Sequence, residues 1–220
     1  MIFQNRKAAG EMLAEKLADY AGRADVVVLA IPRGGVPVGA EVARALGVPL
    51  DIFIVRKLGV PGQEELAFGA IASGGVRVLN DDVVRMAGIT TEEIERVTER
   101  EKKELERRER VYRGERPALA TKGKTVLLVD DGIATGSSMR AGIAALRQHA
   151  PARIVLATPV APASTCRRLR NEVDSIVCVD MPEAFHAIGQ FYADFLPTLD
   201  EEVCALLEEA RPTPARAASN

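Results

Sequence analysis

Short apolar runs alternate with helical patterns along most of this 220-residue sequence, and this alternation constrains the fold more than any other feature. The runs are Val26 to Ile31, Leu50 to Val55, Thr125 to Val129, Ile154 to Thr158 and Ile176 to Val179. Apolar runs of this length are typical of strands that are buried on both faces, and intervening helices imply right-handed crossovers. We therefore predict an α/β fold, a three-layer sandwich with a central, mostly parallel sheet.

Four helices are predicted within this alternation. The first begins after the N-cap Asn5, and its apolar residues recur at helical spacing as far as Leu17. The others are predicted over Val36 to Leu46, Ser138 to Gln148 and Pro162 to Asn171. Because strands and helices alternate along the chain, we expect the helices to cover both faces of the sheet.

Two segments depart from the alternation. Leu66 to Leu79 contains three glycines and predicts an antiparallel excursion or hairpin beside a loop. Thr90 to Arg116 predicts a long charged helix that begins with a capping box of Thr90 and Glu93. Since its charges alternate in sign, a solvated helix is favoured, with a partner-binding or RNA-contacting surface as the alternative.

Composition and charge are those of a globular protein. Hydrophobic residues make up 47% and charged residues 27%, and a formal net charge of -2 gives no positive field for bulk nucleic-acid binding. The three cysteines form no C-x-x-C pair, so we expect buried thiols rather than disulfides or a zinc site. No apolar stretch has the length of a membrane span, and we expect a cytoplasmic protein.

We predict a single domain over residues 1–210, with an insertion at about 80–118. The last residues, Arg211 to Asn220, have little apolar bulk, which predicts a disordered tail.

The segment from Val126 to Ser138 carries the most specific chemical pattern. A buried strand is followed by the paired carboxylates Asp130 and Asp131, and then by a loop of small and hydroxyl-bearing residues: Ala134, Thr135, Gly136, Ser137 and Ser138. Backbone N–H groups, hydroxyls and the following helix N-terminus can surround a phosphate. The two carboxylates can accept hydrogen bonds from the hydroxyls of an attached ribose. The pattern therefore indicates a site for a phosphorylated sugar.

A second strand, turn and helix start spans Ala30 to Gly39. Its turn holds Arg33, Gly34 and Gly35, where backbone amides and a guanidinium can converge on another anion. Arg56 and Lys57 end the next predicted strand, and Leu58 to Glu65 is predicted to be a mobile loop. An ordinary Arg-Gly-Gly turn and solvated surface charges are the alternatives.

Together these motifs resemble the type I phosphoribosyltransferase family, in particular a less-characterised bacterial group with a Pro-Arg-Gly-Gly loop. The resemblance covers roughly Val26 to Val179 and implies an enzyme that binds 5-phosphoribosyl-1-pyrophosphate (PRPP) with Mg²⁺ and transfers the phosphoribosyl group to a nucleobase-like acceptor, releasing pyrophosphate. Residues 134–138 would form the 5′-phosphate loop, and Arg33, Gly34, Gly35 and Arg56 would meet the pyrophosphate. Asp130, Asp131 and Lys57 would be catalytic.

The resemblance also implies finer features. Asp130 and Asp131 would bind Mg²⁺ directly or through water, and a non-proline cis peptide bond is expected close to Arg33 and Gly34. A C-terminal hood at about 180–197 would select the acceptor, with Phe185 as the candidate ring; a place in a satellite core is the alternative for that residue. Dimers are common in the family, so a homodimer is allowed.

One position departs from the family pattern. Ala134 stands where some purine-salvage members carry an aspartate that is assigned as the general base, so deprotonation would fall to Asp131, the hood or solvent. Because of this departure, the alternative function remains a regulatory protein that binds PRPP or a nucleotide with little turnover. A receiver domain and a PRPP synthetase relative fit less well, because the paired aspartates lie in mid-chain and the sequence holds only one such domain.

Overall fold

Five parallel strands form the central sheet in the computed structural model, which describes residues 1–210. In spatial order they are β2 (Leu50–Ile52), β1 (Val26–Ala30), β6 (Thr125–Val129), β7 (Arg153–Val160) and β8 (Ser175–Asp180). All neighbouring pairs are parallel, with Ala30 of β1 opposite Val129 of β6. The predicted parallel sheet is confirmed, and β1 and β6 end side by side.

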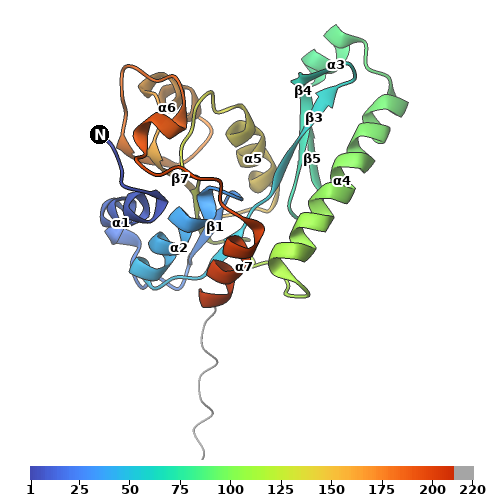
Figure 1. Ribbon diagram of the computed structural model, residues 1–220. Coiled ribbons are helices and arrows are strands. Elements are labelled where there is room, and N and C mark those ends of the chain that lie inside the picture. The colour runs from blue at the N-terminus through green and yellow to red at the C-terminus, as the bar shows by residue number, and fades with distance from the viewer. Residues whose placement is uncertain (211–220) are drawn as a thin grey trace, which may run out of the picture.

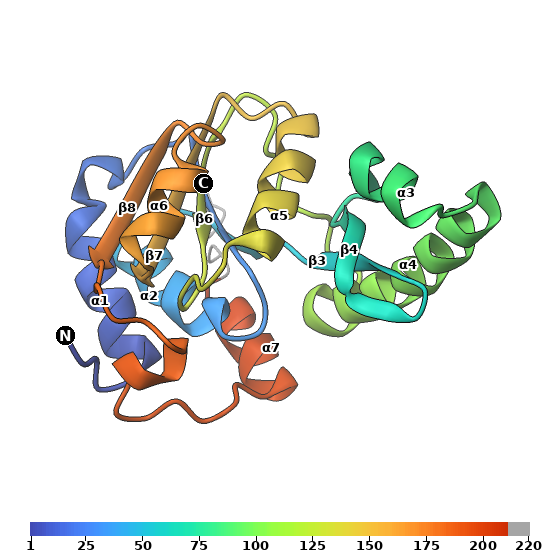
Figure 2. The ribbon, with the colours of Figure 1, turned by 90° about the horizontal axis from the view of Figure 1, so that it is seen from above.

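Helices cover both faces of this sheet and make the predicted three layers (Figures 1 and 2). One face is packed by α1 (Arg6–Lys16), α2 (Gly35–Leu46) and α7 (Asp200–Glu209), and the other by α5 (Ser137–Gln148) and α6 (Ala163–Leu169). Successive residues of β1 point alternately into the two apolar clusters, Val28 with the first group and Val27 with the second. The N-cap Asn5 is confirmed, since its side chain accepts from the Ala8 N–H at 3.0 Å.

The predicted strand from Leu50 to Val55 is wrong as one element. β2 ends at Ile52, and Val55 begins β3 (Val55–Val60) in a second, antiparallel sheet with β4 (Gln63–Ala72) and β5 (Val76–Leu79). Ile54 and Ser73 join at the crossing point through two hydrogen bonds of 2.9 and 3.0 Å. The apolar run continues because the chain stays buried while it passes from one sheet to the other.

The predicted mobile loop from Leu58 to Glu65 is also replaced by regular structure. β3 and β4 form a hairpin, and Val60 pairs with Gln63 across a two-residue turn of Pro61 and Gly62. Gly62 has φ +79°, a left-handed conformation that favours glycine. Arg56 and Lys57 therefore lie within a strand and not at its end.

The antiparallel sheet continues into α3 (Asp81–Ala87) and α4 (Thr91–Arg113), and we call residues 55–113 the arm. The arm stands beside the central body in Figures 1 and 2. α4 begins with the predicted Thr90–Glu93 capping box and packs Ile94, Val97 and Leu105 on one face of the sheet. A buried ion pair of 3.1 Å between Arg113 and Asp51 joins the end of α4 to β2.

Two short 3₁₀ helices, Ala18–Tyr20 and Ile188–Phe191, complete the elements. No helix in residues 1–210 has the length and apolar character needed to span a membrane. The predicted tail at 211–220 lies outside the described residues.

Candidate active site

The two loops predicted from the sequence meet at the carboxyl ends of β1 and β6. A Cβ atom at Gly34 would overlap Oδ2 of Asp131, and one at Gly35 would lie 2.9 Å from the carbonyl oxygen of Val129. The Pro32–Arg33 peptide bond in this turn is cis, close to the expected place. Ligands of open α/β sheets bind at this edge, so both loops can contact one molecule.

Asp131 is held on two sides. Its Oδ2 accepts from Nε of Arg6 at 2.7 Å, and its carbonyl oxygen accepts from the hydroxyl of Tyr192 at 2.5 Å. The Arg6 guanidinium also donates to the carbonyl oxygen of Leu196 at 2.7 Å and lies 4.0 Å from the ring centroid of Phe195. The N-terminal helix and the C-terminal segment thus fix one carboxylate of the pair.

Burial and mutual repulsion set the protonation of the acid pair. Burial, together with the charge of Asp131, raises the pKa of the Asp130 carboxyl well above its ordinary value. Burial also raises the pKa of Asp131, while the hydrogen bond and charge of Arg6 oppose that rise. The pair therefore resists carrying two negative charges until a ligand or a cation shares them.

Two of the four carboxylate oxygens already have protein partners. Oδ2 of Asp131 binds Arg6, and Oδ1 of Asp130 accepts from the Asp131 N–H at 2.9 Å. No N–H group or cation of residues 1–210 donates to the other two oxygens, and the two carboxyl groups hydrogen-bond each other when they share a proton. Ribose hydroxyls, or a hydrated cation, are suitable partners for them.

The loop from Ala134 to Ser138 has the features of an anion site. The backbone N–H groups of Ala134, Thr135 and Gly136 have no acceptor within the described chain. The side chains of Thr135, Ser137 and Ser138 are exposed, and Gly136 has φ +77° at the start of α5. Free donors, hydroxyls and a helix N-terminus together suit a phosphate group.

Side chains of α6 donate hydrogen bonds to two backbone carbonyl oxygens of this loop. Thr165 Oγ1 donates to the carbonyl oxygen of Ala134 at 2.7 Å, and Arg168 donates to that of Thr135 at 3.1 Å. Sequence reasoning missed these two residues, because α5 and β7 separate the helix that carries them from the loop in the chain. Holding the carbonyls leaves the N–H groups free for a ligand.

Lys57 and Arg56 lie on opposite faces of the antiparallel sheet. Lys57 pairs with Ala70 on the face of Val55 and Ala72, which packs toward α5. The Lys57 side chain is exposed and has no ion-pair partner among residues 1–210. Because α5 begins within residues 134–138, Lys57 faces the helix that continues from that loop.

Arg56 points the other way, and the structure does not place it in the predicted pyrophosphate loop. Both its Nε and an NH2 nitrogen donate to Oε2 of Glu101 on α4, at 2.9 and 2.6 Å. Strand alternation explains this, since neighbouring residues of a strand face opposite sides of the sheet. Arg56 therefore joins the sheet of the arm to its helix.

Arg33 is exposed and weakly held. Its nearest acid is Asp200 of α7, with NH1 3.7 Å from Oδ1, and that oxygen also accepts from the hydroxyl of Tyr112 at 2.7 Å. Exposed pairs at such a distance contribute little, so the guanidinium can turn to another anion.

The hood contacts the site through residues other than the predicted one. Phe185 stacks on Phe191 with ring centroids 5.2 Å apart, as part of a satellite cluster. Ile188 instead contacts Gly132, where a Cβ atom would overlap its Cγ2. Ile188, Tyr192 and Arg6 were missed because nothing in their local sequence pattern links them to the acid pair.

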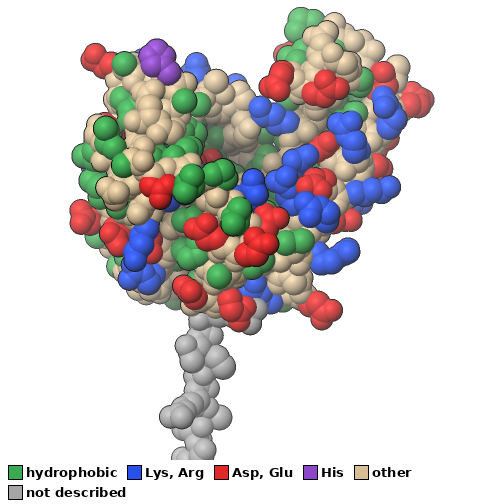
Figure 3. Space-filling view, viewed as in Figure 1, with side chains coloured by type: hydrophobic (Ala, Val, Ile, Leu, Met, Phe, Trp, Pro, Cys, Tyr) green, Lys and Arg blue, Asp and Glu red, His purple; other side chains and the backbone are tan. Residues whose placement is uncertain are grey.

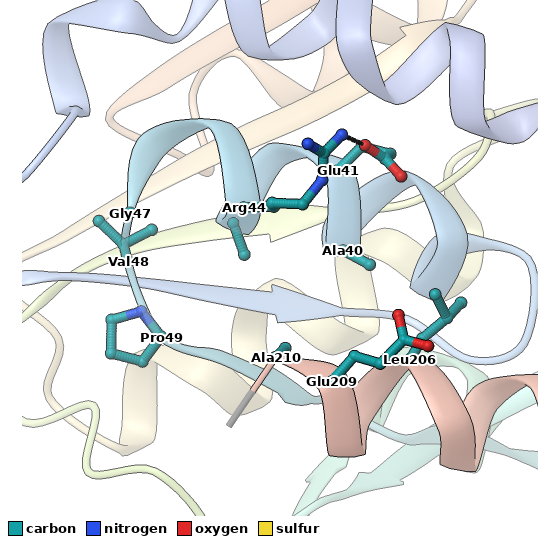
Figure 4. A pocket seen from close by; sticks show the side chains of 10 residues that line it. Ala40, Glu41, Arg44, Gly47, Val48, Pro49, Leu206, Glu209 and Ala210 are labelled. Atoms are coloured by element: carbon teal, nitrogen blue, oxygen red, sulfur yellow. Dashed lines mark hydrogen bonds and ion pairs between the residues drawn. The ribbon is translucent and has the colours of Figure 1, made fainter. Parts of the chain in front are cut away.

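Space for a ligand lies between the body and the arm, where Figure 3 shows a hollow with Lys and Arg side chains gathered on the arm. A separate cavity of about 430 Å³ lies between α2 and α7 and is lined by Ala40, Arg44, Val48 and Leu206, among others (Figure 4). Neither loop lines this cavity. Within residues 1–210, no group of three or more His, Cys, Asp or Glu is arranged to hold a metal ion by protein ligands alone.

Known proteins share this sequence and fold. The chain is 45% identical over 209 residues to the Mycobacterium tuberculosis protein named "Putative phosphoribosyl transferase Rv0571c", covering 95% of this chain and 47% of that protein. The chain thus spans about half the length of the curated relatives it matches. The crystal structure of the TT1426 protein from Thermus thermophilus superposes with a TM-score of 0.86 at 43% identity, covering 96% of this chain and 100% of that one.

The AQ2163 protein of Aquifex aeolicus, at 15% identity and a TM-score of 0.50, shares the fold over 84% of this chain and 78% of its own. The family model of the phosphoribosyl transferase domain matches residues 1–196, which include both loops, the arm and the hood segment up to Leu196. By this match and by the geometry of its paired loops, the chain belongs to the phosphoribosyl transferase domain family.

Proposed function

We propose that the protein binds PRPP with Mg²⁺ and transfers its 5-phosphoribosyl group to a nitrogen of a nucleobase-like acceptor, releasing pyrophosphate. The observation that carries this proposal is the contact of the Gly34–Gly35 turn with Asp130 and Asp131. In this proposal the loop of residues 134–138 would bind the 5′-phosphate, the acid pair the ribose, and the Gly34–Gly35 turn the pyrophosphate. PRPP carries these three groups in the same order.

Each part has a distinct role in this proposal. The N–H groups and hydroxyls of residues 134–138 bind the 5′-phosphate, and the free oxygens of Asp130 and Asp131 accept from the ribose hydroxyls. The backbone of Gly34 and Gly35 admits the pyrophosphate, and Arg33 and Lys57 stabilise the negative charge that builds on it as the bond to the anomeric carbon breaks.

Mg²⁺ would be bound at this site together with the substrate, whose phosphates would supply part of its ligands. It prefers near-octahedral oxygen ligands and keeps several waters, so one or two carboxylates and substrate phosphates suffice. The oxygens of Asp130 and Asp131 that accept from no N–H group are such ligands, directly or through water. When bound, the cation would neutralise part of the pyrophosphate charge.

The acceptor must be deprotonated without an acid in the phosphate loop, because position 134 is an alanine. Burial raises the pKa of Asp130 and of Asp131, which makes the acid pair a better proton acceptor than an ordinary carboxylate. We place proton transfer on this pair or on solvent. Phe185 stacks on Phe191, so the hood side chains that reach the acid pair and its neighbour Gly132 are Tyr192 and Ile188.

The test is pyrophosphate release from PRPP and Mg²⁺ with adenine, guanine, hypoxanthine, xanthine, uracil or orotate as acceptor. We expect release that depends on one base, with loss of turnover in Arg33→Ala and Lys57→Ala. Lys103→Ala, which removes an exposed lysine of α4, is the matched control and should keep wild-type turnover. Release that is equal in the Arg33, Lys57 and wild-type proteins would contradict the proposal.

A regulatory PRPP- or nucleotide-binding protein is the second candidate, favoured by Ala134, which stands where some family members carry a general base. Such a protein needs the phosphate loop for binding but neither Arg33 nor Lys57 for its role. PRPP binding without release with any base of the panel would support it.

A further inference from the structure

Cys166 of α6 and Cys178 of β8 meet in one pocket outside the proposed active site. The pocket holds about 360 Å³ and is lined by Lys16, Arg170, Ile176, Val177 and Met181 besides the two cysteines. Both thiols are half-buried and pack against the same apolar cluster. The lining contains two cations and no acid, a surrounding that favours a thiolate and admits solvent.

The two thiols differ in acidity. Interaction with the Cys178 thiol, helped by the charge of Arg170, lowers the pKa of Cys166 to about 7. Interaction with Cys166, together with burial, raises the pKa of Cys178. The Cys178 S–H also donates to the carbonyl oxygen of Asp180 at 3.1 Å. Its one proton can therefore be donated either to this oxygen or to the sulfur of Cys166. Such a pair has one nucleophilic thiol and one thiol that can resolve it.

We propose that Cys166 and Cys178 form a reversible redox site, in which hydrogen peroxide oxidises Cys166 and Cys178 then closes a disulfide between α6 and β8. The Cys166 thiolate attacks the O–O bond, which breaks to give a sulfenic acid and hydroxide. The Cys178 sulfur attacks the sulfenic sulfur and releases water. The two thiols lose two electrons in total, and the peroxide leaves as two waters.

The position of Cys166 on α6 links this site to the phosphate loop. Thr165, its neighbour, donates to the carbonyl oxygen of Ala134 at 2.7 Å, and Arg168 donates to that of Thr135 at 3.1 Å. A Cβ atom at Gly136 would lie 3.1 Å from Cγ2 of Thr165, so helix and loop are in close contact. A disulfide that draws α6 toward β8 would shift these hydrogen bonds, and we expect PRPP affinity to fall about tenfold. This second step rests on the proposed function.

The third cysteine provides an internal control. Cys204 lies on α7, on the other face of the sheet, and its thiol donates to the carbonyl oxygen of Val111 at 3.3 Å. It should stay reduced when the other two are oxidised.

The experiment treats the full chain with hydrogen peroxide and measures intact mass and non-reduced peptide maps. We expect wild type and Cys204→Ser to lose two hydrogen atoms, to gain a Cys166–Cys178 cross-link, and to recover with dithiothreitol. Cys166→Ser and Cys178→Ser should form no intramolecular cross-link, with Cys166→Ala and Cys178→Ala as second variants if either serine protein unfolds. A cross-link to Cys204, a covalent dimer, or oxidation that stops at a single sulfur would overturn the redox site.

Calorimetry of Mg²⁺–PRPP with reduced and oxidised protein then separates the two proposals. Weaker binding after oxidation is the expected result. Equal affinity in both forms would overturn the link to the phosphate loop. A cross-link in a protein whose reduced form does not bind PRPP would count against the proposed function and leave the redox site standing.

Discussion

Gly34 lies so close to the carboxylate of Asp131 that a Cβ atom at position 34 would overlap Oδ2 of that side chain. Gly34 follows β1 and Asp131 follows β6, so this contact joins two loops that are nearly 100 residues apart in the sequence. Gly34 has φ −59° and ψ −32°, which any residue adopts. The position therefore requires glycine for the close approach and not for its dihedral angles.

Gly34→Ala should separate the loops. The added methyl group displaces the Asp131 carboxylate from Arg6, and we expect Mg²⁺–PRPP affinity to fall by about tenfold or more, the equivalent of one charged hydrogen bond. Titration calorimetry measures it. Gly142→Ala in α5 is a matched control, since its Cβ would meet only the side chains of Val55 and Phe53, at 3.0 and 3.9 Å. Wild-type affinity in Gly34→Ala would show that the contact is not needed.

Arg6 and Asp131 should be energetically coupled. Arg6→Gln leaves a buried carboxylate without its cation, which typically costs about 3 to 5 kcal/mol of unfolding free energy. Asp131→Asn in addition should restore a large part of that loss, because neither charge is then left unpaired. Urea denaturation of both single variants and the double variant gives the coupling free energy. Additive losses would mean that the two side chains do not interact.

Asp130→Asn should change how stability depends on pH in a buffer without divalent cations. The pKa of Asp130 is raised in the folded protein, so between the unfolded value, about 3.9, and the raised value the folded state binds more protons. This group therefore stabilises the folded protein least at high pH, and its contribution falls as pH rises through that window.

The asparagine variant should accordingly unfold at higher temperature than wild type at neutral pH, with a smaller difference at pH 4. Asp25→Asn is the opposite control: the hydrogen bond from Arg23 lowers the pKa of Asp25 to about 2, so its removal should destabilise, slightly, at neutral pH. A thermal scan series from pH 4 to pH 8 checks both signs. A variant less stable than wild type at neutral pH would contradict the raised pKa of Asp130.

Substitutions of the neighbouring residues Lys57 and Arg56 should have different effects, the first on turnover and the second on stability. Lys57→Ala removes an exposed cation on the α5 side of the arm, so we expect kcat/KM to fall about a hundredfold, with little change in unfolding temperature. Arg56→Ala breaks the pair with Glu101, so it should lower the unfolding temperature more than the Lys57 variant does. Steady-state pyrophosphate release and thermal unfolding measure the two effects. A larger loss of turnover in Arg56→Ala and a larger loss of stability in Lys57→Ala would contradict these roles.

Much of the fold follows from local sequence patterns. The apolar strands at Thr125–Val129 and Ile154–Thr158, the Asn5 cap and the Thr90–Glu93 capping box are all confirmed, because short-range hydrogen bonding and burial determine them. The run from Leu50 to Val55 could not be divided from its sequence, since both sheets bury the same kind of residue. Residues 58–65 contain glycine and proline, which suit a hairpin turn as well as a loop.

The predicted site residues that the structure brings together follow the ends of β1 and β6. Arg33, Gly34, Asp130, Asp131 and the loop to Ser138 lie at such ends and are brought to one sheet edge. Arg6, Thr165 and Tyr192 reach the same place only through tertiary packing, 31 to 125 residues away from their partners in the chain. Arg56 and Lys57 were adjacent in a motif, yet strand alternation sends them to opposite faces. The roles of these site residues, the possible homodimer and the domain limits stay predictions.

Calorimetric titration of Mg²⁺–PRPP into wild type, Thr135→Ala and Asp131→Asn tests the central claim most directly. In the proposed site Thr135 would donate its hydroxyl to the 5′-phosphate and Asp131 would accept from the ribose, so we predict binding by wild type and an affinity lower by about tenfold or more in each variant. Thr125→Val, at the opposite end of β6, should bind as wild type does. Unchanged affinity in both Thr135→Ala and Asp131→Asn would show that PRPP does not bind between these loops.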